Sequence, residues 1–403
     1  MCAFVHKVSQ MRRPANVPRS SAMRALILGA GIAGSAAAIA LRSLGIDVDV
    51  YERRPEPGAA SGELGAGVVC WPNATFVLRS LGLLDAVAQQ GNPVTQMQRL
   101  SVAGEGLGSL PTNRIDERLG FPSLAILRST LHRLLCDRAE HAGARFQFGN
   151  SATGLEDHLD GSATVRLADG TTAQADLIVG ADGRMRSASR AYVSGDATPR
   201  SCGFTNWLGT VQTSSPTFAP GVVLDVWGQG ARFGVVPLSE TQAYWAAGLA
   251  GSGHKTWRNA FEGWPAPISE VLSVVGDAHV REIEVFDHDP LPSWHRRNVL
   301  VIGDAAHAAS PTSGQGVGQA LEDVWHLHQI LAGTRNASEA CKQLFEARSA
   351  KTTAIVEVGR SLARSLFDTD PARCQDRDRR SRATDFTAAA DGVAGLWGRG
   401  LPL

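Results

Sequence analysis

Residues 24–52 read RALILGAGIAGSAAAIALRSLGIDVDVYE. Apolar stretches at 24–28 and 47–51 predict two buried strands, and the alanine-rich stretch at 32–44 predicts a helix between them. A strand, a glycine-rich turn, a helix and a second strand within about 30 residues make the βαβ unit of a parallel sheet. This segment therefore predicts an α/β fold.

The turn before the helix, GAGIAG, has the glycine spacing of a dinucleotide-binding motif. Gly29 permits the tight turn, Gly31 lets the backbone approach a pyrophosphate, and Gly34 lets the helix pack against the strand. Glu52 ends the second strand, where a carboxylate accepts hydrogen bonds from ribose hydroxyls and repels a 2′-phosphate. The arrangement favours FAD or NAD over NADP. An ordinary glycine-rich turn is the alternative, because two other stretches of the chain have similar glycine spacing.

Two further motifs follow predicted strands later in the chain. GADG occupies residues 180–183, and GDAAHAASPTSGQG occupies residues 303–316, directly before a predicted helix. Asp182 and Asp304, at strand ends, could hydrogen-bond the ribitol or ribose hydroxyls of a cofactor. Taken singly, each aspartate is also explained as a helix cap.

In this order and at these distances, the three motifs resemble those of the FAD-dependent aromatic hydroxylase family. These are single-component flavoprotein monooxygenases, and the likeness is to the salicylate/urate-hydroxylase-like or zeaxanthin-epoxidase-like branch. The resemblance runs from Arg24 to about Leu331. It implies a Rossmann-type FAD-binding domain with a parallel sheet, interleaved with a mainly antiparallel β-sheet substrate domain and followed by C-terminal helices. Short β-type runs between residues 204 and 284, separated by Gly, Pro and Ser, agree with the antiparallel sheet.

We divide the chain accordingly into an extension, two interleaved domains and a helical end. The divisions are a disordered extension at 1–22; an FAD-binding domain from 23–75, 125–190 and 297–335; a substrate domain from 76–124 and 191–296; and a C-terminal helical region at 336–403. The extension is rich in basic residues and contains no acid, so an organelle transit peptide is the alternative.

The resemblance also implies cofactor contacts. It places Glu52 at the adenosine ribose, Arg128 near the phosphates and Asp304 at the ribitol, while Asp182 serves both FAD and NAD(P)H. The predicted cofactor residues are Gly29, Gly31, Ile32, Ala33, Gly34, Glu52, Arg53, Gly65, Ala66, Arg128, Asp182, Gly303, Asp304, Pro311, Gly314, Gln315, Gly316 and Val317.

The substrate pocket is less specifically marked. Candidate lining residues are Val69, Trp71, Trp207, Arg232 and Phe233, with core packing as the alternative for the aromatic ones. Arg232 and His254 are candidates for contacting a substrate carboxylate. We assign no catalytic residue and interpret His307 as structural.

Two positions depart from the family pattern. Members usually have Ser three residues after the Asp-Gly pair of GADG and Arg three residues after that Ser, whereas Ser187 and Arg190 each come one residue late here. This puts the nicotinamide role of the loop in doubt. Gly318 stands where many members have Asn, although the salicylate-type branch often has Gly.

Composition excludes several other classes. Basic and acidic residues number 39 each, so no net charge attracts nucleic acid or an anionic membrane. The six cysteines form no C-x-x-C pair, which predicts reduced thiols in a cytoplasmic protein with no metal. No apolar run is long enough to span a bilayer. We expect a monomer or homodimer, and we interpret the charge run at 371–384 as a solvated loop or helix face.

The predicted function is an FAD-dependent monooxygenase. It would use NADH or NADPH as a transient co-substrate, and O2, to hydroxylate or epoxidise a small aromatic, heteroaromatic or polyketide-like substrate through a flavin C4a-hydroperoxide. Only one dinucleotide βαβ unit is apparent, so NAD(P)H would have no Rossmann domain of its own. The alternatives are a flavin-dependent reductase or dehydrogenase, a halogenase, which lacks support because no W-x-W-x-I-P segment occurs, and a non-catalytic flavin-binding protein.

Overall fold

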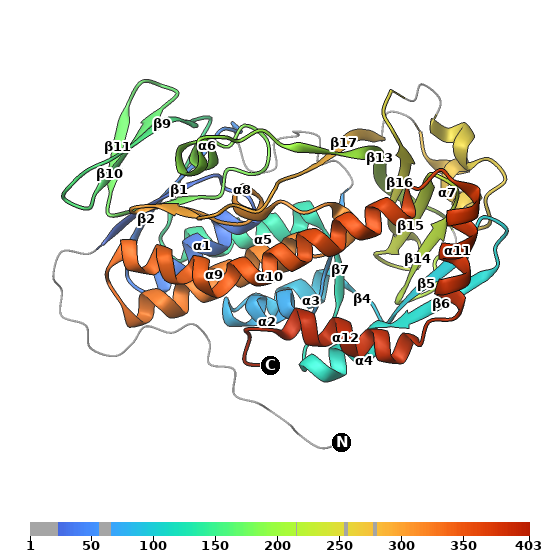
Figure 1. The fold of residues 1–403 in the computed structure, drawn as a ribbon. Coiled ribbons are helices and arrows are strands. Elements are labelled where there is room, and N and C mark those ends of the chain that lie inside the picture. The colour runs from blue at the N-terminus through green and yellow to red at the C-terminus, as the bar shows by residue number, and fades with distance from the viewer. Residues whose placement is uncertain (1–22, 56–65, 215, 254–256, 277–279) are drawn as a thin grey trace, which may run out of the picture.

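The structure, a computed structural model, describes residues 23–55, 66–214, 216–253, 257–276 and 280–403. The predictions made for residues 1–22, for Gly65 and for His254 lie outside the described residues. Five cysteines are described, and all five are free thiols. The α/β class is confirmed, with one largely parallel sheet, one largely antiparallel sheet and a helical C-terminal end (Figure 1).

The first sheet has six strands, and both strands predicted from the opening segment lie inside it. In spatial order the strands are β18 (His295–Arg296), β19 (Val299–Val301), β12 (Leu177–Gly180), β1 (Arg24–Leu28), β2 (Asp47–Glu52) and β8 (Arg145–Phe148). All neighbouring pairs are parallel except β18 with β19. The carboxyl ends of β1, β12 and β19 therefore meet at one edge, and each is followed by one of the three motifs.

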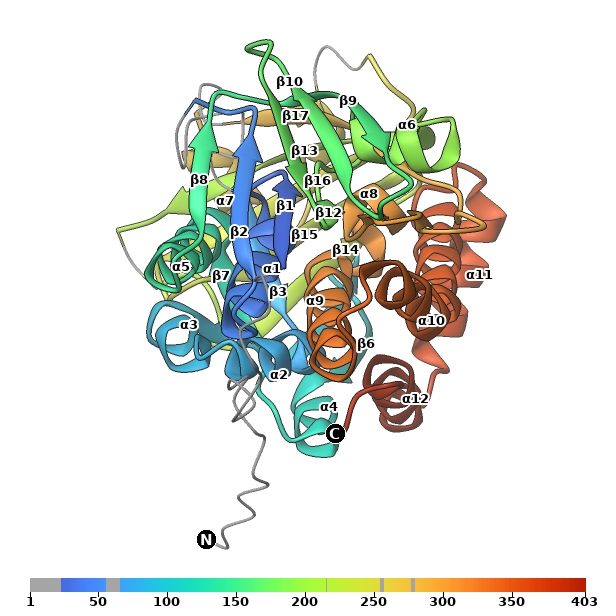
Figure 2. The same ribbon diagram turned by 90° about the vertical axis from the view of Figure 1, so that its left-hand side faces the viewer.

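Both faces of this sheet are covered, so its strands are apolar almost throughout. Side chains alternate between the faces of a strand. Ala25 and Ile27 pack with the helices, whereas Leu26 and Leu28 pack with a three-stranded meander on the other face (Figure 2). The helices are α1 (Ile32–Ser43), α5 (Arg128–His141) and α9 (Gly316–Gly333), and the meander comprises β9 (Ala152–Asp157), β10 (Ala163–Leu167) and β11 (Thr172–Ala175).

The second sheet has seven strands drawn from two separate parts of the chain. Their order is β17 (Arg281–Asp287), β13 (Arg200–Gln212), β16 (Gln242–Ala250), β15 (Ala231–Pro237), β14 (Val222–Trp227), β5 (Gln96–Ser101) and β6 (Gly106–Pro111). Its pairings are antiparallel except for that of β14 with β5. One face packs against η1 (Trp257–Phe261) and α7 (Ile268–Val274) to form a second core.

One predicted boundary needs correction. Residues 76–90 were assigned to the substrate domain, but they form most of α2 (Pro72–Ser80), the turn after it and α3 (Leu84–Gln90). Their apolar side chains Phe76, Leu83 and Val87 lie in the first core. The hydrophobic pattern shows that these helices have a buried face, and it does not show which sheet buries that face. The remaining elements are β3 (Gly67–Cys70), β4 (Asn92–Pro93), α4 (Thr112–Leu119), β7 (Leu124–Leu127), α6 (Ala188–Ser194), α8 (Asp304–His307) and η3 (Pro311–Ser313).

Three helices end the chain: α10 (Ala337–Leu366), α11 (Pro371–Arg382) and α12 (Phe386–Gly398). Figure 1 shows α10 running from beside α9 toward the seven-stranded sheet. Within the described ranges, no helix is long and apolar enough to cross a membrane, and no cluster of side chains is suited to hold a metal ion.

Buried ion pairs join α10 to α9. Arg348 donates from Nε to Asp323 at 2.9 Å and also bonds Glu322, and its side chain is 1% exposed. Lys351 donates to Glu322 at 2.8 Å and to the carbonyl of Arg399, after α12, at 2.9 Å. Because buried charges are tolerated only when paired, these contacts fix how the C-terminal helices sit on the first domain.

We expect Arg348→Met to lower the free energy of unfolding by about 3–5 kcal/mol, because it removes the cation that is bonded to both buried carboxylates. Chemical denaturation followed by circular dichroism measures the change. Lys342→Met on the same helix is the control: its ion pair with Glu346 is about 60% exposed, so its effect should stay within about 0.5 kcal/mol. Equal losses in the two variants would show that the buried network contributes no more to the free energy of unfolding than the exposed ion pair does.

Candidate active site

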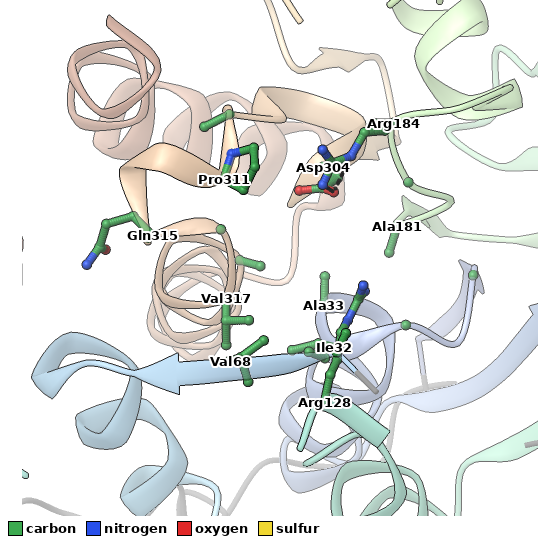
Figure 3. Close-up of a pocket in the computed structure, with 18 of the residues that line it drawn as sticks. Ile32, Ala33, Val68, Arg128, Ala181, Arg184, Asp304, Pro311, Gln315 and Val317 are labelled. Carbon is green, nitrogen blue, oxygen red and sulfur yellow. Dashed lines mark hydrogen bonds and ion pairs between the residues drawn. The ribbon is translucent and has the colours of Figure 1, made fainter. Parts of the chain in front are cut away.

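A cavity of about 710 Å³ lies between the motif-bearing edge of the first sheet and the second sheet. Its size is within the range of small-molecule and cofactor sites. Of the predicted cofactor residues, those lining it are Gly29, Gly31, Ile32, Ala33, Glu52, Arg53, Ala66, Arg128, Asp182, Asp304, Pro311, Gly314, Gln315, Gly316 and Val317 (Figure 3). Gly34 and Gly303 are adjacent to the lining residues but do not line it.

Two of the three glycines of the first turn are required by close backbone contacts. Gly29 has φ of +99°, and a Cβ there would lie 2.4 Å from the carbonyl oxygen of Ala181. A Cβ on Gly34 would lie 1.9 Å from the carbonyl oxygen of Gly29, so only glycine lets α1 pack this closely. At Gly31 the space is open. Since α1 has no side-chain cap and no acid in its first turn, its N–H groups can receive an anionic pyrophosphate at this end of the cavity.

Glu52 is held beside this turn. Its Oε2 accepts a hydrogen bond from the backbone N–H of Ala30 at 2.8 Å, and its Oε1 accepts one from that of Arg54 at 3.0 Å. The residue is 8% exposed and faces the cavity. A carboxylate offers about four lone-pair sites, so acceptor capacity remains for ribose hydroxyls.

The GADG loop absorbs its departure from the family pattern. Arg186 adopts φ of +57°, an uncommon conformation for a residue other than glycine. After this extra residue, Ser187 caps α6 and donates to Asp182 at 2.6 Å. Arg190 reaches across to the carbonyl oxygens of Ala305 and Ala306 at 3.0 and 3.1 Å. The late serine and arginine are thus both tied into the site.

Asp304 has a partner that the sequence motifs did not reveal. Arg184, two residues after Asp182, donates to Oδ2 of Asp304 from Nη2 at 2.8 Å and from Nε at 3.1 Å. Burial by itself would raise the pKa of Asp304, but the guanidinium groups of Arg184 and Arg128 outweigh it and the pKa is lowered. The carboxylate therefore stays ionised and can accept hydrogen bonds from hydroxyl groups. Figure 3 shows Arg184 against Asp304, with Arg128 reaching toward the same space.

The second departure from the family pattern also has a steric reason. A Cβ on Gly318 would lie 2.6 Å from the side-chain nitrogen of Asn73. That nitrogen donates to the side-chain oxygen of Gln315 at 2.8 Å and to Glu322 at 2.7 Å. Gly318 thus makes room for an asparagine supplied by α2, which orients Gln315 at the start of α9. Like α1, α9 has no acid in its first turn, so its N–H groups can stabilise negative charge on a bound ring.

Beyond the predicted cofactor residues, the cavity continues against the second sheet. Val69, Trp71 and Arg232 line it, as does a set that sequence reasoning missed: Met97, Asn206, Val223, Val236 and Tyr244. Trp71 is held by a hydrogen bond from Nε1 to the carbonyl of Gly314 at 2.8 Å. Arg232 donates to Asp225 at 2.6 Å. Burial raises the pKa of Tyr244 to about 12, so its phenol is a neutral hydrogen-bonding group.

Trp207 and Phe233 were predicted to line the pocket, and the structure places them elsewhere. They are 2% and 0% exposed and pack in the second core, where the ring of Phe233 stacks 5.7 Å from that of Trp245. Phe233 follows Arg232 along β15, so the two side chains point to opposite faces. Both faces of this strand are apolar enough that composition does not distinguish the core from the cavity.

Comparisons with known proteins agree with this geometry. The profile of the family described as "FAD binding domain" matches residues 22–358. The chain is 36% identical over 323 residues to an aurachin C monooxygenase/isomerase of Stigmatella aurantiaca, covering 76% of this chain and 80% of that protein. It is 33% identical over 394 residues to a 3-amino-4-hydroxybenzoate 2-monooxygenase of Streptomyces cremeus, covering 94% and 96%.

A solved structure gives the same result. Klebsiella pneumoniae HpxO complexed with FAD and uric acid superposes with a TM-score of 0.85 at 27% identity, over 93% of this chain and 96% of that one. A FAD-dependent urate hydroxylase of Klebsiella pneumoniae is also 33% identical over 338 residues, covering 80% of this chain and 84% of that protein. The chain belongs to the FAD-dependent aromatic hydroxylase family and is an FAD-dependent monooxygenase.

Proposed function

We propose that this monooxygenase oxygenates a small, flat aromatic or heteroaromatic ring carrying an acidic ring substituent such as a phenol. The observation that carries the proposal is the shape of the cavity of about 710 Å³. It runs from two uncapped helix N-termini past the Asp304 carboxylate to an apolar pocket with a single arginine, Arg232. Two relatives are named for urate and for 3-amino-4-hydroxybenzoate, which are small, flat rings with an ionisable group.

Residues at the motif-bearing edge of the first sheet would hold FAD. The N-terminus of α1 would receive its pyrophosphate, Glu52 its adenosine ribose and Asp304 its ribitol, with the turn 314–317 beside its ring. When bound and reduced by NAD(P)H, the flavin supplies the oxygen-activating chemistry. A cytoplasmic location and a monomeric or dimeric state remain predictions.

The residues of the second sheet would position the substrate. Arg232 would face the ionised ring substituent, and a ring anion is more electron-rich at the neighbouring carbons than the neutral ring. Asp225 would hold the guanidinium in place through the hydrogen bond that it accepts from Nε. Trp71, Val69 and Val223 would form apolar walls that exclude water from the reacting atoms.

We expect the purified protein to retain FAD and to oxidise NADH or NADPH faster when its substrate is present. A screen of phenolic and heteroaromatic acids should find a compound whose product gains one oxygen atom, traced by mass spectrometry with isotopically labelled O2. Turnover that continues unchanged in anaerobic buffer would instead support a reductase. A bound flavin that NAD(P)H never bleaches, with any compound, would support a non-catalytic binding protein.

Glu52→Gln should weaken FAD binding roughly ten- to a hundredfold, because hydrogen bonds to a charged acceptor contribute about 1.5–3 kcal/mol. Fluorescence titration of the apoprotein with FAD measures the dissociation constant. Glu156→Gln is the matched control, since that glutamate is exposed on β9 outside the cavity. Unchanged affinity in Glu52→Gln would exclude the ribose contact.

Arg232→Gln should lower kcat/KM for the anionic substrate by roughly ten- to a hundredfold, because it removes one charge-assisted hydrogen bond. A neutral analogue of the same ring should lose much less, which separates lost recognition from general damage. Retained flavin absorbance checks folding. Equal losses for both compounds would remove Arg232 from substrate recognition.

A further inference from the structure

A second cavity, of about 590 Å³, lies at the far end of the strands that border the first. On β5, Met97 lines the first cavity and Arg99 the second; on β14, Val223 lines the first and Trp227 the second. Residues two apart share a strand face and are separated by about 7 Å. The two cavities therefore open on the same face of the same strand pair, yet they share no lining residue.

The wall opposite these strands is α11, the charge run of the sequence, which Figure 1 shows beside β5 and β6. Arg373, Arg377 and Arg380 recur at helical spacing and line the cavity with Asp376. The other lining residues are Ser361, Arg364, Ser365, Asp368, Ser381 and Thr384. The charge run at 371–384, which we interpret from the sequence as a solvated loop or helix face, thus borders a cavity lined by five arginines and two aspartates.

The arginines of α11 already have carboxylate partners. Arg373 binds Asp368 through two hydrogen bonds of 2.6 and 2.9 Å, and Arg380 lies 3.2 Å from Asp376. Arg377 is 6% exposed and donates to the neighbouring Asp378 at 2.8 Å. These arginine–aspartate pairs fix the α11 side of the cavity, and they leave no excess positive charge on it.

Arg99 and Arg364 supply the excess positive charge of the cavity. In the described part of the chain, neither has a carboxylate within ion-pair distance. The guanidinium of Arg99 lies 5.0 Å from the ring of Trp227 and 5.1 Å from that of Phe386. Gly108 makes this possible, because a Cβ there would lie 2.0 Å from the Phe386 ring. Burial lowers the pKa of Arg99 and outweighs the attraction of the Asp225 carboxylate, its neighbour across the strand pair, to which it is not bonded.

Three donors of residues that line this cavity also lack acceptors. Nε of Arg99, Nε1 of Trp227 and Oγ of Ser381 are buried and have no hydrogen-bond partner among the described residues. Trp227 and Ser381 are 7% and 6% exposed. Buried donors are nearly always paired in folded proteins, so a group of three beside unpaired cations indicates a missing acceptor.

We propose that this second cavity binds the phosphate group of a small molecule, held by Arg99 and Arg364 with Arg377 behind them. Guanidinium groups match phosphate oxygens in geometry and charge. A phosphate monoester presents three acceptor oxygens and nearly two charges, which suits two cations and donors arriving from a strand and two helices better than a single carboxylate does. The site is separate from the flavin cavity and does not depend on the oxygenation reaction.

Isothermal titration of the holoenzyme, saturated with FAD so that the first cavity is filled, tests the proposal with inorganic pyrophosphate and AMP as probes and citrate as a carboxylate comparison. We expect pyrophosphate and AMP to bind, and citrate to bind at least about fivefold more weakly at equal ionic strength. Arg364→Gln should weaken pyrophosphate binding by at least about fivefold, the effect of losing one charged contact of about 1 kcal/mol. Arg364 is exposed and unpaired, so this variant should fold, and retained flavin absorbance checks that it does.

Arg382→Gln is the matched control. It removes the same charge from the end of α11, where Arg382 pairs with Glu105 outside the cavity, and should change affinity less than about twofold. Absence of binding at millimolar pyrophosphate would overturn the site. Equal weakening in the two variants would reduce it to diffuse surface charge, and citrate binding as tightly as pyrophosphate would overturn the assignment to phosphate.

Discussion

The parallel pairing of β1 with β12, and of β12 with β19, is the constraint on which the rest of the site depends. The register aligns Leu28 with Gly180 and Gly180 with Val301, so three strands end together. The turns that follow them are then forced to be neighbours although they are far apart in the chain. Gly29 against Ala181, Arg184 against Asp304, and Arg190 against α8 are all contacts between these turns. A change of one residue in the register would separate them.

Around this edge, irregularities in one loop are compensated by geometry nearby. The extra residue in the GADG loop is taken up at Arg186, after which Ser187 and Arg190 reach their partners. Gly318, which stands where many family members have asparagine, leaves room for Asn73 of α2 to donate to Gln315. In both places a neighbouring element accommodates the departure from the family pattern.

The zero net charge of the chain conceals strong local separation of charge. Between α9 and α10, buried cations and anions neutralise each other and fasten the C-terminal helices. In the first cavity the Arg232 guanidinium is paired through Nε with the Asp225 carboxylate. In the second cavity Arg99 is packed between rings with no bonded counter-charge. Burial makes such differences matter, because charges interact more strongly away from water.

The sequence by itself determined the α/β class, the βαβ unit and the family, because each rests on local spacing: apolar periods, glycines at fixed intervals and an acid at a strand end. Only the tertiary structure decided which face of a strand meets the cavity. It shows that Arg232 lines the cavity, whereas Phe233 and Trp207 pack in the second core. It alone paired Arg184 with Asp304 and Asn73 with Gln315. The physical reason is that, when both faces of a strand are apolar, the sequence does not show which face packs in the core and which lines the cavity. Contacts between residues far apart in the chain depend in turn on how whole sheets pack.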